Sequence, residues 1–221
     1  MNPAMENRPS RFKLVLFTLG LALIAASPSM ATTFTVHGYQ LGERIALTDG
    51  TRVWTAQLDV TLEGVATHVA SYCVDLQTSI APGVYTVNNV LDAFNTPSPT
   101  GETPRNLAWA GHVIENFSVA SLAVGGITAQ QAITGIQAAI WEGIYGGGKI
   151  DVTSLSANAR LVYNQILSTK ILGDGPALVV DLRGYQDQVI RGGSAVPEPS
   201  AALVFGLGTV VVGSLVRRKA A

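Results

Sequence analysis

The sequence contains a single cysteine, Cys73, and charged residues make up only 13% of its 221 residues. One cysteine cannot form an internal disulfide. No set of histidines or carboxylates has the spacing of metal ligands, and the glycine run 146–148 does not have the lysine and hydroxyl context of a phosphate-binding loop. We therefore expect no metal and no cofactor.

Basic residues are also scarce in the middle of the chain. Residues 32–196 hold eight Lys or Arg against thirteen Asp or Glu, a net charge of about −5. The total charge is only −1 because six of the fourteen basic residues lie near the two ends. An acidic central region without a basic cluster argues against nucleic acid as a partner. Its length suits one domain, which we place at residues 32–195.

The N-terminal segment, residues 1–31, has the pattern of a secretion signal. Arg8, Arg11 and Lys13 precede the apolar run 14–26, and Ser29-Met30-Ala31 places small residues at the cleavage position. The mature protein is then expected to begin at Thr32. A membrane anchor is the alternative, but the run is shorter than the roughly 20 residues that a span needs.

Residues 34–76 alternate between polar and apolar side chains and are rich in Thr, Val and aromatic residues, which predicts three or four strands. Turns are expected at Gly38, Gly42, Asp49-Gly50 and Gly64. Further strands are predicted at residues 84–90 and 177–182. In the strand that contains Cys73, alternation puts its side chain on the opposite face from Tyr72 and Val74.

A loop with three prolines, residues 95–104, separates these strands from a helical region. One helix is expected from Thr103-Pro104 to about residue 117, and a second after the capping box formed by Thr128 and Gln131. Ser154 or Ser156 caps a third helix, whose expected inward residues are Leu161, Val162, Ile166 and Leu167. The predicted fold class is α+β: a β-rich sandwich or barrel-like sheet with a helical insertion of about three helices.

The second helix carries a glutamine in the middle of its apolar face. At helical spacing this face consists of Ile133, Ile136, Gln137, Ile140, Trp141 and Ile144. Burying a carboxamide costs roughly 1–3 kcal/mol unless its polar atoms find partners. Gln137 is therefore a candidate functional residue.

Two short motifs contain these candidates: Tyr72-Cys73-Val74-Asp75, and Ile136-Gln137-Ala138-Ala139-Ile140-Trp141. The pair, in this order, resembles the two signature motifs of bacterial thioester domains, and the resemblance covers mainly residues 34–182. It implies that Cys73 and Gln137 condense to an internal thioester. Tyr72, Asp75, Ile136, Ile140 and Trp141 match as motif neighbours, with no bond-forming role implied for Asp75 or Trp141. The implied activity is covalent capture of a surface amine or hydroxyl by an adhesin or cross-linker, not by an enzyme.

The C-terminal segment, residues 196–221, has three features in order. Pro197-Glu198-Pro199 precedes an apolar run, residues 201–216, and Arg217-Arg218-Lys219 follows it. This order resembles the PEP-CTERM sorting signal, which implies processing by an exosortase in the inner membrane of a Gram-negative bacterium that makes extracellular polysaccharide. The expected location is the inner membrane before processing, and then the cell surface or the biofilm matrix. An ordinary single-pass membrane anchor is the alternative.

Three other interpretations of the central region stay open. Cys73 and Gln137 can simply pack in a non-reactive structural matrix protein, since a lone cysteine is most often a small buried hydrophobe. Cys73 can form an intermolecular disulfide. A secreted cysteine protease or transglutaminase would use His112 or His68 as a base, although neither lies in a recognisable motif; we expect His112 on a helix surface.

Overall fold

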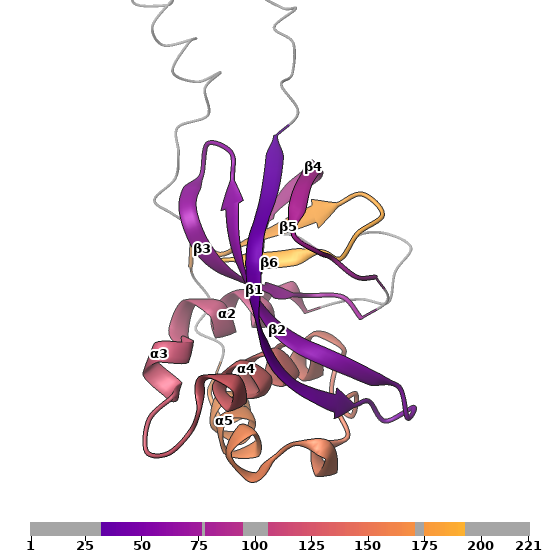
Figure 1. Ribbon diagram of the computed structural model, residues 1–221, viewed down its shortest axis with the longest axis vertical. Helices are drawn as coiled ribbons and strands as arrows, with labels where there is room; N and C mark the ends of the chain where they lie inside the picture. Colours follow the sequence, from indigo (N-terminus) through magenta and orange to yellow (C-terminus); the bar gives the residue numbers. More distant parts are fainter. Residues whose placement is uncertain (1–31, 77, 95–105, 171–174, 193–221) are drawn as a thin grey trace, which may run out of the picture. The chain divides into compact units, whose positions relative to one another are not determined.

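The computed structural model of the protein describes residues 32–76, 78–94, 106–170 and 175–192 (Figure 1). The signal segment and the C-terminal sorting segment lie outside these residues. Strands within the described part are β1 (Thr33–Ala46), β2 (Arg52–Leu62), β3 (Ala66–Cys73), β4 (Gly83–Asp92), β5 (Leu178–Leu182) and β6 (Gln188–Ile190). Helices there are α2 (Leu107–Asn116), α3 (Val119–Leu122), α4 (Ala129–Ile144) and α5 (Ala157–Leu167), with a short 3₁₀ helix at Val152–Ser154.

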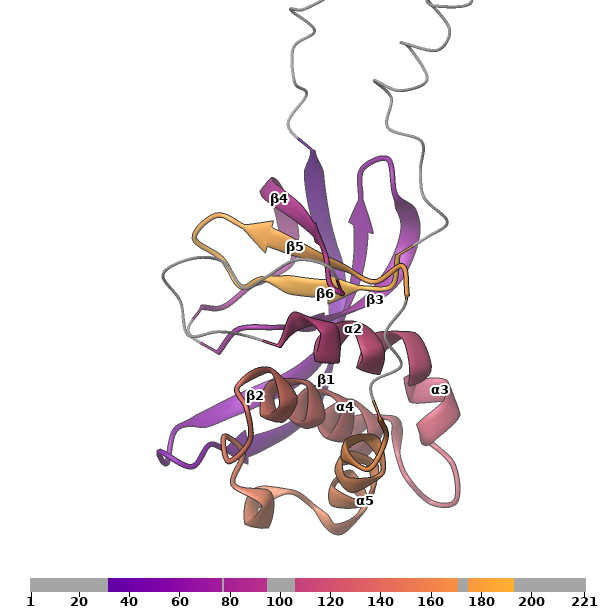
Figure 2. The ribbon, with the colours of Figure 1, turned by 180° about the vertical axis from the view of Figure 1, so that it is seen from behind.

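The strands form one antiparallel sheet that closes on itself. Their order is β1-β2-β3-β6-β5-β4, and β4 pairs with β1 to complete the barrel. The helices come between β4 and β5 in the chain and lie at one end of the barrel (Figures 1 and 2). The mixed α+β class predicted from the sequence is therefore confirmed.

The helices begin where polar side chains cap them. Asn106, Thr128 and Ser156 each accept a hydrogen bond from a backbone N–H in the first turn of α2, α4 and α5. Thr128 and Gln131 form the expected capping box, and α4 ends before three glycines with positive φ. The prediction missed α3, which Ser118 caps. The expected start of the first helix, Thr103-Pro104, lies outside the described residues.

Two glycines that were expected to form turns lie inside the single long strand β1. The pairing register of β1 with β2 shifts between Val36 and Gly38 and again between Leu41 and Arg44, so these positions are bulges. At the second bulge the Glu43 N–H donates to Thr134 of α4 at 2.7 Å. A side chain at Gly42 would clash with the Thr134 hydroxyl, so the glycine lets α4 approach the sheet closely.

Other departures from the sequence prediction concern the C-terminal half. Leu161 was expected to face inward but is 61% exposed, whereas Val162 and Ile166 are fully buried. The expected strand at 177–182 is β5, but the short strand β6 after it was not predicted. This omission matters because β6 pairs with the Cys73 end of β3.

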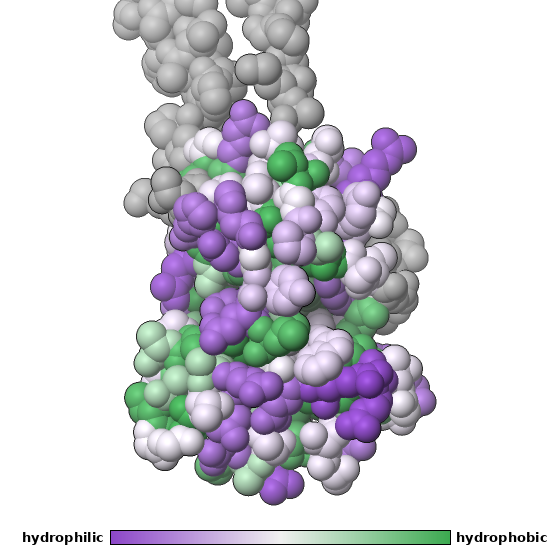
Figure 3. Space-filling model, in the orientation of Figure 1, coloured by the Kyte–Doolittle hydropathy of each residue, from purple (hydrophilic) through white to green (hydrophobic). Residues whose placement is uncertain are grey.

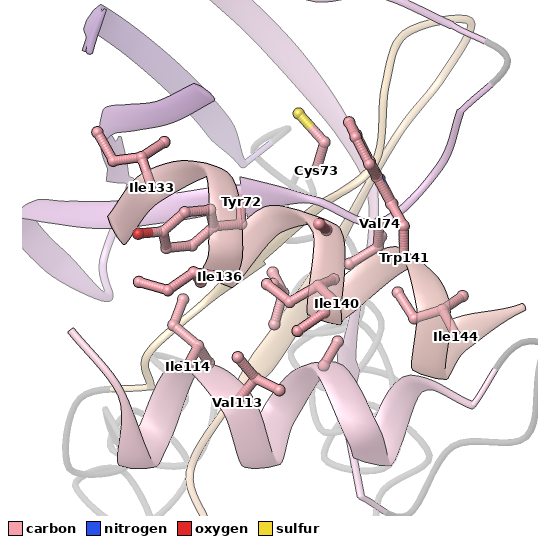
Figure 4. Packing of buried hydrophobic residues seen from close by; sticks show 14 of the residues in the cluster. Tyr72, Cys73, Val74, Val113, Ile114, Ile133, Ile136, Ile140, Trp141 and Ile144 are labelled. Carbon is pink, nitrogen blue, oxygen red and sulfur yellow. The ribbon is translucent and has the colours of Figure 1, made fainter. Parts of the chain in front are cut away.

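Helix α4 is the centre of the core. It packs against the other three α-helices and against β1 and β2, and its apolar residues from Ile133 to Ile144 are almost completely buried (Figure 4). This arrangement brings the polar side chain of Gln137, also fully buried, to the inner end of β3. The barrel and the helical insertion therefore meet at the two residues that the motifs single out.

Candidate functional site

Cys73 is the last residue of β3, and it is 6% exposed. It stands directly opposite Gln188 of β6 in the antiparallel register. On the opposite side of β3, Cys73 has no paired residue in β2, because the pairing of β2 with β3 reaches only as far as Leu58 and Ser71. The backbone N–H and C=O of Cys73 on that side need partners from elsewhere.

Gln137 supplies those partners. The Cys73 N–H donates to Gln137 Oε1 at 3.1 Å, and Gln137 Nε2 donates to the Cys73 carbonyl at 2.8 Å. The carboxamide thus takes the place of a neighbouring strand where β2 leaves β3. The structure brings these two predicted site residues together, 64 positions apart in the sequence, with the side chain of one on the backbone of the other.

The sulfur of Cys73 contacts a second glutamine, Gln188, which the sequence analysis did not identify. Gln188 Nε2 donates to Cys73 Sγ at 3.4 Å and to the carbonyl of Gln186 at 3.2 Å, while its Oε1 accepts from the Ser71 hydroxyl at 2.9 Å. Directly paired residues in a sheet project to the same face, which explains the contact. The sequence signal that could have identified Gln188 is its place directly before two apolar β-branched residues, Val189 and Ile190.

The environment of the thiol favours its protonated form. Burial raises the pKa of Cys73 from its ordinary value of 9.0 to about 12; the Asp75 carboxylate acts in the same direction and the hydrogen bond from Gln188 opposes it. Catalytic cysteines have the opposite environment, since a neighbouring cation or a helix N-terminus lowers their pKa. As a thiol, Cys73 is protected from ionisation and from the oxidation that follows it.

The motif neighbours surround this pair. Tyr72 points away from the sulfur, as Figure 4 shows, and its hydroxyl accepts a hydrogen bond from Gln57 at 2.9 Å. Asp75 accepts from the Thr78 hydroxyl and from the Asp187 N–H, so it ties the end of β3 to the turn before β6. Ile136 and Ile140 are fully buried and flank Gln137 on α4.

Trp141 lies one helical turn after Gln137 and is 2% exposed. Its ring stands beside Cys73 (Figure 4), and both residues line one pocket. In the part of the chain that the structure describes, the buried Trp141 Nε1 has no hydrogen-bond partner. Trp109 differs, because its Nε1 donates to the Ala139 carbonyl at 2.8 Å.

The pocket beside Cys73 has a volume of about 440 Å³. Leu58, Cys73 and Trp141 contribute its buried part, and Tyr39 and Trp54 of the β1–β2 hairpin contribute exposed side chains. Hydrophobic surface is visible on the face where β1 and β2 run in front of the helices (Figure 3). A solute can therefore approach the Cys73 side of the site from this pocket.

The histidines that the enzyme interpretation would use lie in other surroundings. His68 is exposed and bonds Asp59 at 2.9 Å; five residues of strand, about 16 Å, separate it from Cys73. His112 is 2% exposed, so the expected surface position was wrong. Its ring bonds the Thr169 hydroxyl at 3.1 Å, and burial lowers its pKa.

Two features are absent from the residues that the structure describes. No group of three or more His, Cys, Asp or Glu side chains there has an arrangement that could hold a metal ion. None of the helices described is both long enough and apolar enough to span a membrane. The Pro197-Glu198-Pro199 motif lies outside the described residues.

Comparison of the chain with protein-family models, with curated proteins and with solved structures gives no match. The function of this chain is therefore inferred from the two motifs and from the geometry around Cys73.

Proposed function

We propose that this protein is an exported surface or matrix protein that forms a thioester between Cys73 and Gln137 and uses it to attach covalently to a nucleophile on a target surface. The observation that supports this proposal best is the pair of hydrogen bonds between the Gln137 carboxamide and the Cys73 backbone. These bonds hold the carboxamide carbon next to the residue that carries the only thiol of the chain.

Bond formation requires proximity and exclusion of water. The thiol sulfur attacks Gln137 Cδ, the Cδ–Nε2 bond breaks, and the thiol proton leaves with the nitrogen as ammonia. The two hydrogen bonds to the Cys73 backbone, which hold the carboxamide beside this residue, favour that proximity. The fully buried Ile136 and Ile140 shield the helix side of the bond from water, which would otherwise hydrolyse the thioester to a glutamate at position 137.

Capture of a target reverses the role of the sulfur. An amine or hydroxyl attacks Gln137 Cδ, the Cδ–Sγ bond breaks, and the proton of the nucleophile ends on Cys73 Sγ. Because burial raises the pKa of Cys73 to about 12, the sulfur leaves as a thiol and needs that proton. Gln188 Nε2, at 3.4 Å, is a donor that stabilises charge developing on the sulfur during departure.

The two chain ends support the location in this proposal. A secretion signal at residues 1–31 would export the protein, and an exosortase would process the PEP-CTERM segment at residues 196–221 in the inner membrane. The mature protein would then act at the cell surface or in the extracellular polysaccharide matrix of a Gram-negative bacterium, with a surface amine or hydroxyl as its covalent partner.

Intact-mass spectrometry of the freshly isolated exported protein tests the bond, with peptide mapping to establish its termini. The expected mass is about 17 Da below the sequence mass, through loss of ammonia. Methylamine should then add at Gln137 and free the Cys73 thiol, detected by alkylation in denaturant because the folded thiol is buried. The full sequence mass with an alkylatable Cys73 before methylamine treatment would refute the proposal.

A non-reactive structural matrix protein is the second candidate, and one observation favours it. Both polar atoms of the Gln137 carboxamide already have partners on the Cys73 backbone, so a structural role by itself accounts for a buried glutamine. The same mass measurement separates the two candidates.

A further inference from the structure

Strand β2 extends past the point where its pairing with β3 stops. It pairs with β1 over its whole length, but with β3 only from Leu58 onward. Residues 52–57 therefore have no strand partner on the β3 side in the part of the chain that the structure describes. The Gln137 carboxamide fills this opening for β3 by bonding the Cys73 backbone, and no described group does the same for β2. The sheet has an open edge here.

The pairing pattern shows which backbone groups of β2 face this open edge. Cys73 directs its N–H and C=O toward the β2 side, so Ser71, two residues earlier, points the same way and bonds Leu58 opposite it. Backbone groups alternate in direction along a strand, so those of Ala56 and Trp54 point to the same side as those of Leu58. Each of these two residues offers an N–H and a C=O to an extended chain.

The pocket beside Cys73 lies along the same edge. It is lined by residues of β2 and of the segment that follows β3, namely Val53, Trp54, Ala56, Leu58 and residues 78–82. Native sheets ordinarily cover a free edge or place charges on it, but residues 53–56 carry none. A strand added here would direct every second side chain to the face that Trp54 and Ala56 share, against apolar surface.

Two arginines stand at the hairpin end of this edge. Arg52 lies on the same face as Trp54 by alternation, and Arg44 of β1 is directly opposite Trp54. Both arginines are exposed, and among the described residues neither forms an ion pair. An acidic side chain on an added strand would meet this positive charge if it stood opposite Arg52.

We propose that the open edge of β2 binds an extended peptide segment of a partner protein, running antiparallel to β2. Apolar side chains of this segment stand opposite Ala56 and Trp54, and an acidic side chain stands opposite Arg52. From its N-terminal end the segment is therefore apolar at its first and third positions and acidic at its fifth. This docking is noncovalent, requires no thioester, and goes beyond the proposed function. Because Cys73 lines the same pocket, it would bring the partner to the proposed site of capture.

The first test uses a fluorescein-labelled peptide, Ser-Val-Thr-Val-Thr-Glu-Ser, and the full chain with Cys73→Ala, which prevents covalent capture. Fluorescence anisotropy measures the binding. Methylation of both valine nitrogens removes the N–H groups that face β2 and should weaken binding at least about tenfold. Methylation of both threonine nitrogens, which face away from β2, is the matched control and should change the affinity by less than about twofold.

Substitutions in the protein test the same contact from the other side. Ala56→Pro removes an N–H from the open edge without removing a bond to β1, and should weaken binding at least about tenfold. Arg52→Glu should weaken binding about fivefold and should favour a peptide with Lys in place of Glu. Arg160→Glu, at an exposed position on α5, makes the same change of charge and should leave the affinity unchanged.

Three outcomes would overturn the inference. The first is equal binding of the two methylated peptides, a comparison that holds even if Ala56→Pro fails to fold. The second is unchanged affinity in Ala56→Pro. The third is the absence of saturable binding, with or without a dimer in sedimentation velocity that Ala56→Pro dissociates, because a second copy or another segment of the chain would then cover the edge. All these proteins lack the thioester, so the mass measurement tests the proposed function separately.

Discussion

Two buried glutamines reach Cys73 from different regions of the molecule, and they bind different parts of it. Gln137, from helix α4, bonds the backbone of Cys73, whereas Gln188, from strand β6, bonds the sulfur. Both are completely buried. The motif resemblance assigns the reactive role to Gln137, although Gln188 makes the direct contact with the thiol. The motif resemblance and the contact with the sulfur therefore point to different glutamines as the candidate acyl donor.

The largest expected effect separates these roles. Gln137→Glu should abolish the loss of about 17 Da, because a carboxyl group has no ammonia to lose, and Gln188→Glu should retain it. Both substitutions place the same group in a fully buried position, so each is the control for the other. Intact-mass spectrometry gives the answer, and the reverse outcome would assign the bond to Gln188.

The second prediction compares the structural roles in a Cys73→Ala background, where no cross-link contributes. Gln137→Leu leaves the backbone N–H and C=O of residue 73 without their partners, which should cost roughly 2–5 kcal/mol of unfolding free energy. Gln188→Leu should cost less, about 1–2 kcal/mol, because the Ser71 hydroxyl keeps its bond to the Val189 carbonyl. Urea unfolding measures both, and a larger loss for Gln188→Leu would contradict this ranking.

The third prediction concerns pH and applies to protein with a free Cys73 thiol. The folded pKa of about 12 exceeds the ordinary value of 9.0, so the unfolded chain ionises first and gains stability as the pH rises. Relative to Cys73→Ala, the free-thiol protein should therefore lose about 2 kcal/mol between pH 9 and pH 10.5. Below pH 9 the unfolding free energies of the free-thiol protein and of Cys73→Ala should change with pH in the same way. Chemical unfolding at each pH measures both.

The smallest effect is expected at Ser71, which supports Gln188. Its fully buried hydroxyl donates to Gln188 Oε1 at 2.9 Å, so Ser71→Ala should destabilise the fold by about 1 kcal/mol. Ser168→Ala, at an exposed position, is a suitable control and should change the unfolding free energy by less than about 0.5 kcal/mol. Equal stability of these two variants would show that Gln188 does not need this donor.

The same comparison explains which parts of the structure the sequence predicted. Gln137 was found because α4 is long, strongly periodic and capped by Thr128, which fixes the face that it buries. Gln188 was missed because β6 has only three residues, too few for alternation to show. Its burial comes from its position between β5 and β3, and its partner in β3, Cys73, lies 115 residues away in the sequence, which local patterns do not record.

Other errors have similar causes. Gly38 and Gly42 were interpreted as turns because glycine signals a break in the pattern, whereas tertiary pairing with β2 keeps the strand continuous through two bulges. His112 was expected on a helix surface because it is polar. It lies instead on the buried face of α2, where Thr169 and Asn116 form hydrogen bonds with its ring. In both cases contacts with another segment of the chain decided the outcome: strand β2 for the glycines, and Thr169 for the histidine.

The position of β6 between β3 and β5 has a mechanical consequence for an attached protein. Tension applied along β6 would load this strand lengthwise against its two neighbours, β3 and β5. Hydrogen bonds sheared in this way share the applied force, whereas a strand peeled from a sheet edge loses its hydrogen bonds one after another. If the protein attaches to a target as proposed, drag on its C-terminal end would load β6, the strand that pairs with the Cys73 end of β3.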